Sequence, residues 1–182
     1  IKKSGDDHPY LYLCYYKDDD THCEKVDRLF EDLRKAGVPG EKILYDQWVS
    51  IDAHTRTSYI DKIQSSGKII MIGSPKLKTV YEERSDTKQK RKIEDINLDD
   101  GVDLLRLREG IKGTEGIIPV CFEDNEMDVF PGGLLKLRPR KLTDYHVGFL
   151  NLLQDLYSGM YEGINPREGF IYEAIKRFTT LK

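Results

Sequence analysis

Cysteine and long apolar runs are the two features that this sequence of 182 residues has least of. Its three cysteines, Cys14, Cys23 and Cys121, are an odd number and form no CxxC pair. This usage is typical of free thiols in a reducing compartment rather than of a disulfide framework. No apolar run approaches the roughly 18 residues that a membrane-spanning helix needs. We therefore expect a cytoplasmic protein without membrane insertion.

A strong charge of one sign is also missing. The net charge is −3 although 34% of the residues are charged, so the composition indicates no nucleic-acid partner. The four histidines, His8, His22, His54 and His146, are scattered without the spacing of metal ligands. We therefore expect no metal site.

Glycine is missing where a dinucleotide-binding loop would need it. The first predicted strand, "PYLYLCYY" (9–16), is followed by "KDDDTH", which has no glycine and carries negative charge where a phosphate would lie. This excludes a G-x-G-x-x-G site, and no Walker-type loop occurs elsewhere. The three aspartates Asp18, Asp19 and Asp20 suggest a phospho-receiver domain instead. That chemistry needs an acceptor aspartate after the third strand, where this chain has Gly73-Ser74-Pro75, so we consider it improbable.

Short apolar runs alternate with amphipathic segments along the chain. After 9–16, strands are predicted in "KILYD" (42–46), "KIIMIGSP" (68–75) and "GIIPVCFE" (116–123), with a weak edge strand in 131–144. Helices are predicted in 20–36, 58–67, 144–159 and the tail beyond Asn165.

Two of these helices have a predicted cap or a predicted inner face. For the first helix, Asp20 or Thr21 can cap the start. For the helix in 144–159, five residues are expected on the inner side: Val147, Leu150, Leu153, Leu156 and Tyr157. The alternation of strands and helices predicts an α/β fold, a three-layer doubly wound (flavodoxin-like) parallel sheet of four to five strands with helices on both faces.

The order of these segments resembles the Toll/interleukin-1 receptor (TIR) superfamily, including its SEFIR and bacterial-type members. "YLYLCYYKDDD" looks like the first-strand box of the family, and "VDRLFEDLRKAGV" with "KILYDQW" is similar to its next helix and strand. "SYIDKIQSSGKIIMIGSPKL", "GIIPVCFE" and "FPGGLLKLRPRKLTDYHVGFLNLLQDLYSG" resemble its later segments. The resemblance covers roughly 9–158. It implies a TIR/SEFIR-like domain over 1–158 with a charged insertion at about 80–98, and a C-terminal helical extension over 159–182.

Members of this superfamily act either as interaction modules or as enzymes that cleave NAD. The resemblance implies a signalling or interaction module that associates with TIR-type domains, by self-association or through an adaptor. The predicted ligand or partner loop comprises Tyr16, Lys17, Asp46, Gln47, Trp48 and Ser74. No cofactor is expected. The basic run "KQKRK" (88–92) is read as a solvated face that could dock an acidic partner.

The alternative is an NAD glycohydrolase, for which NAD is the substrate. In the family a glutamate lies about eleven or twelve residues before the "IIPV" strand, and here that count reaches Leu105 or Arg106, just after Gly101-Val102. The nearest glutamate is Glu109, about one helical turn later, which is therefore the candidate catalytic carboxylate in this alternative. A third option is a nucleotide-sensing domain that binds without turnover.

Overall fold

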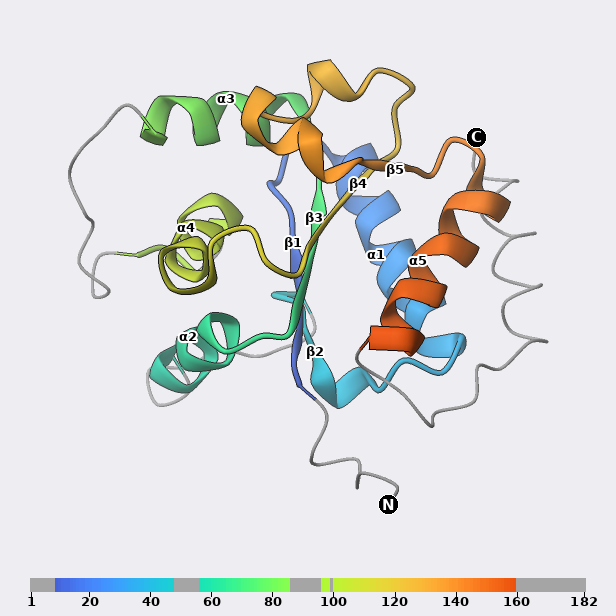
Figure 1. The fold of residues 1–182 in the computed structure, drawn as a ribbon, viewed down its shortest axis with the longest axis horizontal. Helices are drawn as coiled ribbons and strands as arrows, with labels where there is room; N and C mark the ends of the chain where they lie inside the picture. The colour runs from blue at the N-terminus through green and yellow to red at the C-terminus, as the bar shows by residue number, and fades with distance from the viewer. Residues whose placement is uncertain (1–8, 48–55, 86–95, 99, 160–182) are drawn as a thin grey trace.

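The structure is a computed structural model, and it describes residues 9–47, 56–85, 96–98 and 100–159 (Figure 1). Trp48, the basic run 88–92 and the predicted C-terminal extension beyond Gly159 lie outside the described residues. Among the helices that are described, none is both long and apolar enough to cross a membrane.

The core of the domain is a five-stranded sheet in the order β2-β1-β3-β4-β5. Its strands are β1 (Leu11–Cys14), β2 (Ile43–Leu44), β3 (Lys68–Ile72), β4 (Ile117–Cys121) and β5 (Arg140–Lys141). All four neighbouring pairs are parallel. The strand order changes direction between β1 and β3, which makes their carboxyl ends the switch point of a doubly wound sheet. The predicted fold class is confirmed.

Helices cover both faces of this sheet (Figure 1). On one face, α1 (Asp20–Lys35) and α5 (Tyr145–Gly159) bury one set of strand side chains, including Leu13, Ile70 and Val120. On the other face, α2 (Arg56–Gln64) and α4 (Gly101–Lys112) bury the alternate set, including Tyr12 and Met71. Because the central strands are covered on both sides, they read in the sequence as continuous apolar runs.

Shorter elements lie near the ends of the strands. In Figure 1, α3 (Pro75–Ser85) lies at the carboxyl edge of the sheet together with the 3-10 segments η4 (Glu126–Asp128) and η5 (Gly132–Leu137). A further 3-10 turn, η2 (Gly40–Lys42), leads directly into β2. The carboxyl edge is therefore covered from above by α3 and from the side by the start of α4.

The start of α1 differs from the prediction by one residue. Asp19, not Asp20 or Thr21, is the N-cap, and its Oδ1 accepts a hydrogen bond of 2.7 Å from the backbone N of His22. Asp20 and Thr21 follow Asp19 directly and belong to the first turn of α1. Asp19 reaches the third helical N–H and has the extended backbone that a cap requires.

The prediction of which α5 residues face inward was partly wrong. Val147 and Leu150, which were expected inside, are 51% and 36% exposed, whereas Leu153 and Leu156 are buried as expected. The inward row also contains residues that were not assigned to it, namely Tyr145, Phe149 and Leu152. Apolar residues occur around most of this helix, so spacing alone allowed two faces.

The predicted charged insertion at about 80–98 is anchored at both ends. Val80 and Tyr81 belong to α3 and pack against the core cluster formed with α2 and α4. At the other end Ile96 is buried and Leu98 packs against the same cluster. The described residues at the two ends of this interval are thus part of the folded domain.

Candidate functional site

Asp46 is the centre of a polar cluster at the carboxyl edge. The Tyr15 hydroxyl, just beyond β1, donates a hydrogen bond of 2.6 Å to Asp46 Oδ1, which follows β2. Lys17 Nζ lies 3.4 Å from Asp46 Oδ2, and the Gln47 amide donates to the same oxygen. Burial, followed by the hydrogen bond to Asp46, raises the pKa of the Tyr15 hydroxyl, which therefore stays a neutral donor.

A second cluster joins the end of β1 to the start of α3. The Ser74 hydroxyl donates to Asp18 Oδ1 at 2.6 Å and accepts from the backbone N of Leu77 at 3.1 Å, which caps the helix. The backbone N of Lys76 donates to the other Asp18 oxygen, and Lys76 Nζ donates to the Asp18 carbonyl. Ser74 is completely buried, so this cluster holds α3 on the sheet.

The residues of the predicted ligand or partner loop thus fall into two groups. Lys17, Asp46 and Gln47 meet around one carboxylate, while Ser74 contributes to the separate Asp18 cluster. Tyr16 is half-buried and packs against the core on the α2 and α4 side. The sequence analysis grouped these side chains as one loop on the basis of the family resemblance, and it did not assign Tyr15 or Asp18 as their partners.

The first residue of α4 lies directly on β1. A Cβ added to Gly101 would come within 2.3 Å of the Tyr15 carbonyl oxygen, closer than any side chain allows. The Cys14 thiol also donates to the Gly101 carbonyl at 3.4 Å. A glycine is therefore required at this point for the helix to approach the strand so closely.

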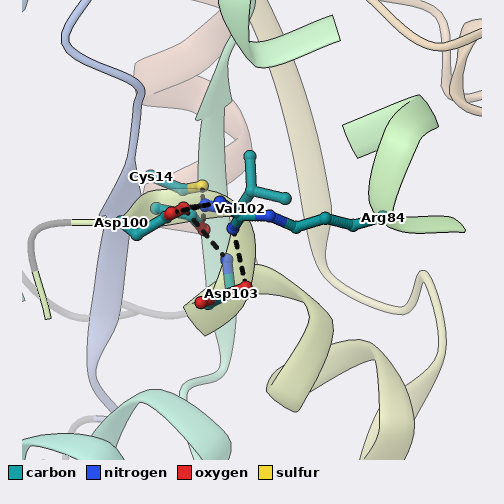
Figure 2. A network of polar contacts seen from close by, with 6 residues as sticks. Cys14, Arg84, Asp100, Val102 and Asp103 are labelled. Atoms are coloured by element: carbon teal, nitrogen blue, oxygen red, sulfur yellow. Dashed lines mark hydrogen bonds and ion pairs between the residues drawn. The ribbon is translucent and has the colours of Figure 1, made fainter. Parts of the chain in front are cut away.

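Arg84 fixes this helix start from the other side (Figure 2). Its guanidinium donates to Asp100 Oδ2 and to Asp103 Oδ1, both at 2.6 Å, which links the last turn of α3 to the first turn of α4. Asp100 is at the same time the N-cap, because its Oδ1 accepts from the backbone N of Val102 and Asp103. The hydrogen bond to Asp100 raises the pKa of Arg84 further, so the group is a permanent cation. Two acidic residues at a helix N-terminus also suit its dipole.

These contacts leave little space at the strand ends. A cavity of about 10 Å³ remains there, enough for about one water molecule. It is lined by Tyr12, Leu13, Tyr15, Asp46, Tyr59, Leu98 and Gly101. Small-molecule sites usually enclose roughly 300–1,000 Å³. This described cavity is therefore too small for a small-molecule ligand.

Arg108 holds the other end of α4. Its side chain is fully buried and donates from Nε and one terminal nitrogen to the Ser66 carbonyl, and from the latter also to the Glu115 carbonyl. Ser66 and Glu115 precede β3 and β4, so this end of the helix lies at the amino edge of the sheet. No local feature of the sequence marks Arg108 as buried, because "LRLREG" looks like a solvated helix surface.

Glu109 follows Arg108 in the chain, but its side chain faces α3. It is eight residues beyond Gly101, which corresponds to roughly 12 Å along the helix axis. Both of its carboxylate oxygens accept from the Tyr81 hydroxyl of α3, at 3.0 and 2.9 Å. The Arg106 guanidinium lies over the Tyr81 ring, 5.4 Å from its centroid, and Leu105 is fully buried. Glu109 as a catalytic carboxylate remains a prediction.

Burial raises the pKa of Glu109, while the Tyr81 hydrogen bond and the Arg106 charge lower it in part. The folded protein therefore holds this proton more tightly than the unfolded chain. Its contribution to stability is present at low pH. It is lost as the pH rises from about 4.3, the ordinary glutamate pKa, through the raised value in the folded state.

The variant Glu109→Gln tests this direction of the change in stability with pH. We expect its unfolding free energy to equal that of the parent near about pH 4 and to exceed it increasingly towards neutral pH, by no more than about 1 kcal/mol. Urea unfolding at several pH values measures the difference. Tyr81→Phe removes the hydrogen bond that opposes the shift, so it should make the parent's loss of stability with pH steeper. A Glu109→Gln difference that does not change with pH would contradict this account.

Comparison with known proteins identifies a solved structure with a similar fold. No protein-family model matches the chain, and no curated protein matches it. A solved structure titled "Crystal Structure of a prokaryotic SEFIR domain" aligns with 79% of this chain and 95% of its own, with a TM-score of 0.51 and 19% sequence identity. At this identity the likeness establishes architecture. The chain therefore has the SEFIR/TIR-like fold that the order of its sequence motifs predicted.

Proposed function

We propose that this domain is a signalling module that associates with TIR-type domains, either with further copies of itself or with an adaptor. The observation that carries the proposal is the polar cluster around Asp46 at the carboxyl edge of a SEFIR/TIR-like fold. Such an edge presents charged and amide groups to a partner.

The surface that supports association is the one around Asp46. Gln47 and Lys17 are exposed, and both contact the half-buried Asp46 carboxylate, so their orientations are partly fixed before any partner arrives. Preorganised groups lose less conformational entropy on binding than mobile ones. Trp48 is the next residue of this loop in the sequence, and tryptophan is a common anchor of protein interfaces.

Light scattering on the full chain tests this proposal. We expect a mass that rises above the monomer with concentration, or capture of a TIR-type domain in mixing experiments. Gln47→Arg adds a large charged group to the proposed surface and should weaken association at least about tenfold, or 1.4 kcal/mol. Gln64→Arg, the same substitution at the amino edge of the sheet, should not. A strict monomer at high concentration that captures no TIR-type domain would overturn the proposal.

The alternative function is cleavage of NAD with Glu109 as the carboxylate. What favours it is a half-buried glutamate with a raised pKa on α4, since perturbed carboxylates concentrate at active sites. What opposes it is that both oxygens of this carboxylate already accept a hydrogen bond from Tyr81. Release of nicotinamide from NAD by the purified protein, lost in Glu109→Gln, would establish the alternative. No release under crowded conditions would exclude it.

A further inference from the structure

The described side chains that α5 exposes most carry no charge, and Asp155 at their border, about a third exposed, is paired with Arg140. The four exposed side chains of this helix that the structure describes are Val147, Leu150, Asn151 and Gln154. Val147 and Leu150 are the more apolar pair, and they are neighbours on the helix surface because they are three residues apart. In a protein with 34% charged residues, a helix surface of this kind calls for an explanation.

The lack of charge is specific to α5 and does not extend over that side of the molecule. The helix α1 covers the same face of the sheet. Its four exposed side chains are Asp20, Thr21, Glu24 and Asp27, three of which are acidic. A surface that only has to face water is therefore built here from charged residues, and α5 departs from that pattern.

The chain continues from the end of α5 with 23 further residues, 160–182, which lie outside the described part. Their sequence predicts a second amphipathic helix. Asn165 and Pro166 match a helix N-cap and first position, and the apolar residues that follow at helical spacing are Phe170, Ala174, Ile175 and Phe178, with Ile171 next to Phe170. Glu173, Lys176 and Arg177 lie between them, so this helix would have one apolar side to bury.

We propose that this C-terminal segment folds back along α5 as an antiparallel helix and covers its uncharged side. The four exposed residues of α5 have the spacing three, one and three. Read in the opposite chain direction, this is also the spacing of Ile171, Ala174, Ile175 and Phe178. In the antiparallel register, Val147 faces Phe178 and Leu150 faces Ile175. In the same register Asn151 faces Ala174, and Gln154 faces Ile171.

The lengths of the segments fit this arrangement. A connection of six residues (160–165) falls within the usual range for helices that are antiparallel neighbours. Helix α5 has 15 residues and is roughly 22 Å long, and a helix over 166–181 would be roughly 24 Å long. A second copy of the chain would have to displace a segment that is already tethered at the end of α5. Docking of the chain's own C-terminal segment is therefore favoured over docking of a second copy. The proposal does not rest on the association proposed above.

Disulfide trapping in the full chain tests the register. In a Cys23→Ser background, which leaves only the buried Cys14 and Cys121, we would introduce Leu150→Cys together with Ile175→Cys. Mild oxidation should give an intramolecular disulfide, seen by mass spectrometry, at least about tenfold faster than in the matched control Leu150→Cys with Lys176→Cys. In the control, the second thiol belongs to the charged side of the helix, and disulfides need their Cβ atoms within about 4.5 Å.

Each outcome decides the question. Equal rates for the two pairs would show that the segment is not docked, and a disulfide-linked dimer would assign the surface to a second copy; either result overturns the proposal. A second measurement does not depend on the disulfide. Trypsin should cleave after Lys176 and Arg177 at least about tenfold faster in Ile175→Asp than in the parent, because docking limits access to the chain. Unchanged cleavage would also overturn it.

Discussion

Replacing Arg84 with glutamine is expected to lower the free energy of unfolding by about 3 kcal/mol, the lower end of the range for breaking a buried ion pair. The substitution leaves the Asp100 and Asp103 carboxylates, whose side chains are only 12% and 6% exposed, next to each other without their shared cation. Like charges in a poorly solvated place cost more than the lost attraction alone. Urea unfolding followed by circular dichroism measures the change.

Arg34→Gln is the matched control for this prediction. Arg34 forms an ion pair with Glu31 one turn away on α1, and both side chains are about a third exposed. Because exposed pairs contribute little, the loss should be below about 1 kcal/mol. Adding Asp103→Asn to Arg84→Gln should recover part of the stability, because it removes one of the two unpaired charges. Equal losses for Arg84→Gln and Arg34→Gln would mean that the contact in Figure 2 does not hold α4 in place.

The second large effect is expected at Gly101. Replacing this glycine with alanine should destabilise the protein, whereas the same replacement at Gly110, in the same helix, should stabilise it. Gly101→Ala places a methyl group against the Tyr15 carbonyl and should cost about 1–3 kcal/mol, since the backbone of β1 or of α4 must shift. Gly110→Ala meets no atom within 4 Å and should stabilise the protein by about 0.5–1 kcal/mol through helix propensity. Stabilisation by both substitutions would contradict the close approach of α4 to β1.

Helices and strands were predictable from the sequence where the pattern of apolar residues allowed only one interpretation. Strands β3 and β4 were recognised because a continuous apolar run of that length is typical of a strand buried on both faces. The inner face of α5 was not, since apolar residues at Val147 and Leu150 fit helical spacing as well as those at Phe149 and Leu152. The spacing of apolar residues therefore identifies a helix reliably. It does not identify the buried side of the helix when both sides carry apolar residues.

The candidate site was predictable in its place and not in its contacts. Asp46 and Ser74 were assigned together to a ligand or partner loop, and both lie where parallel strands end at one edge of the sheet. Their division into two clusters depends on the partners Tyr15 and Asp18, whose side-chain directions the sequence does not encode. Arg84 was missed because its partners Asp100 and Asp103 lie 16 and 19 residues away, and their meeting depends on how α3 crosses the sheet.

The contact between Arg84 and Asp100 also closes a loop, and this has a consequence for how the domain can vary in length. The two ends of residues 85–99 are held together by the ion pair, independently of what the intervening sequence is. Closing a longer loop costs little extra entropy, about 0.6 kcal/mol for each doubling of its length. Insertions within this interval should therefore leave the register of α4 on β1 unchanged, so the domain can acquire new surface there without changing its strand-end contacts.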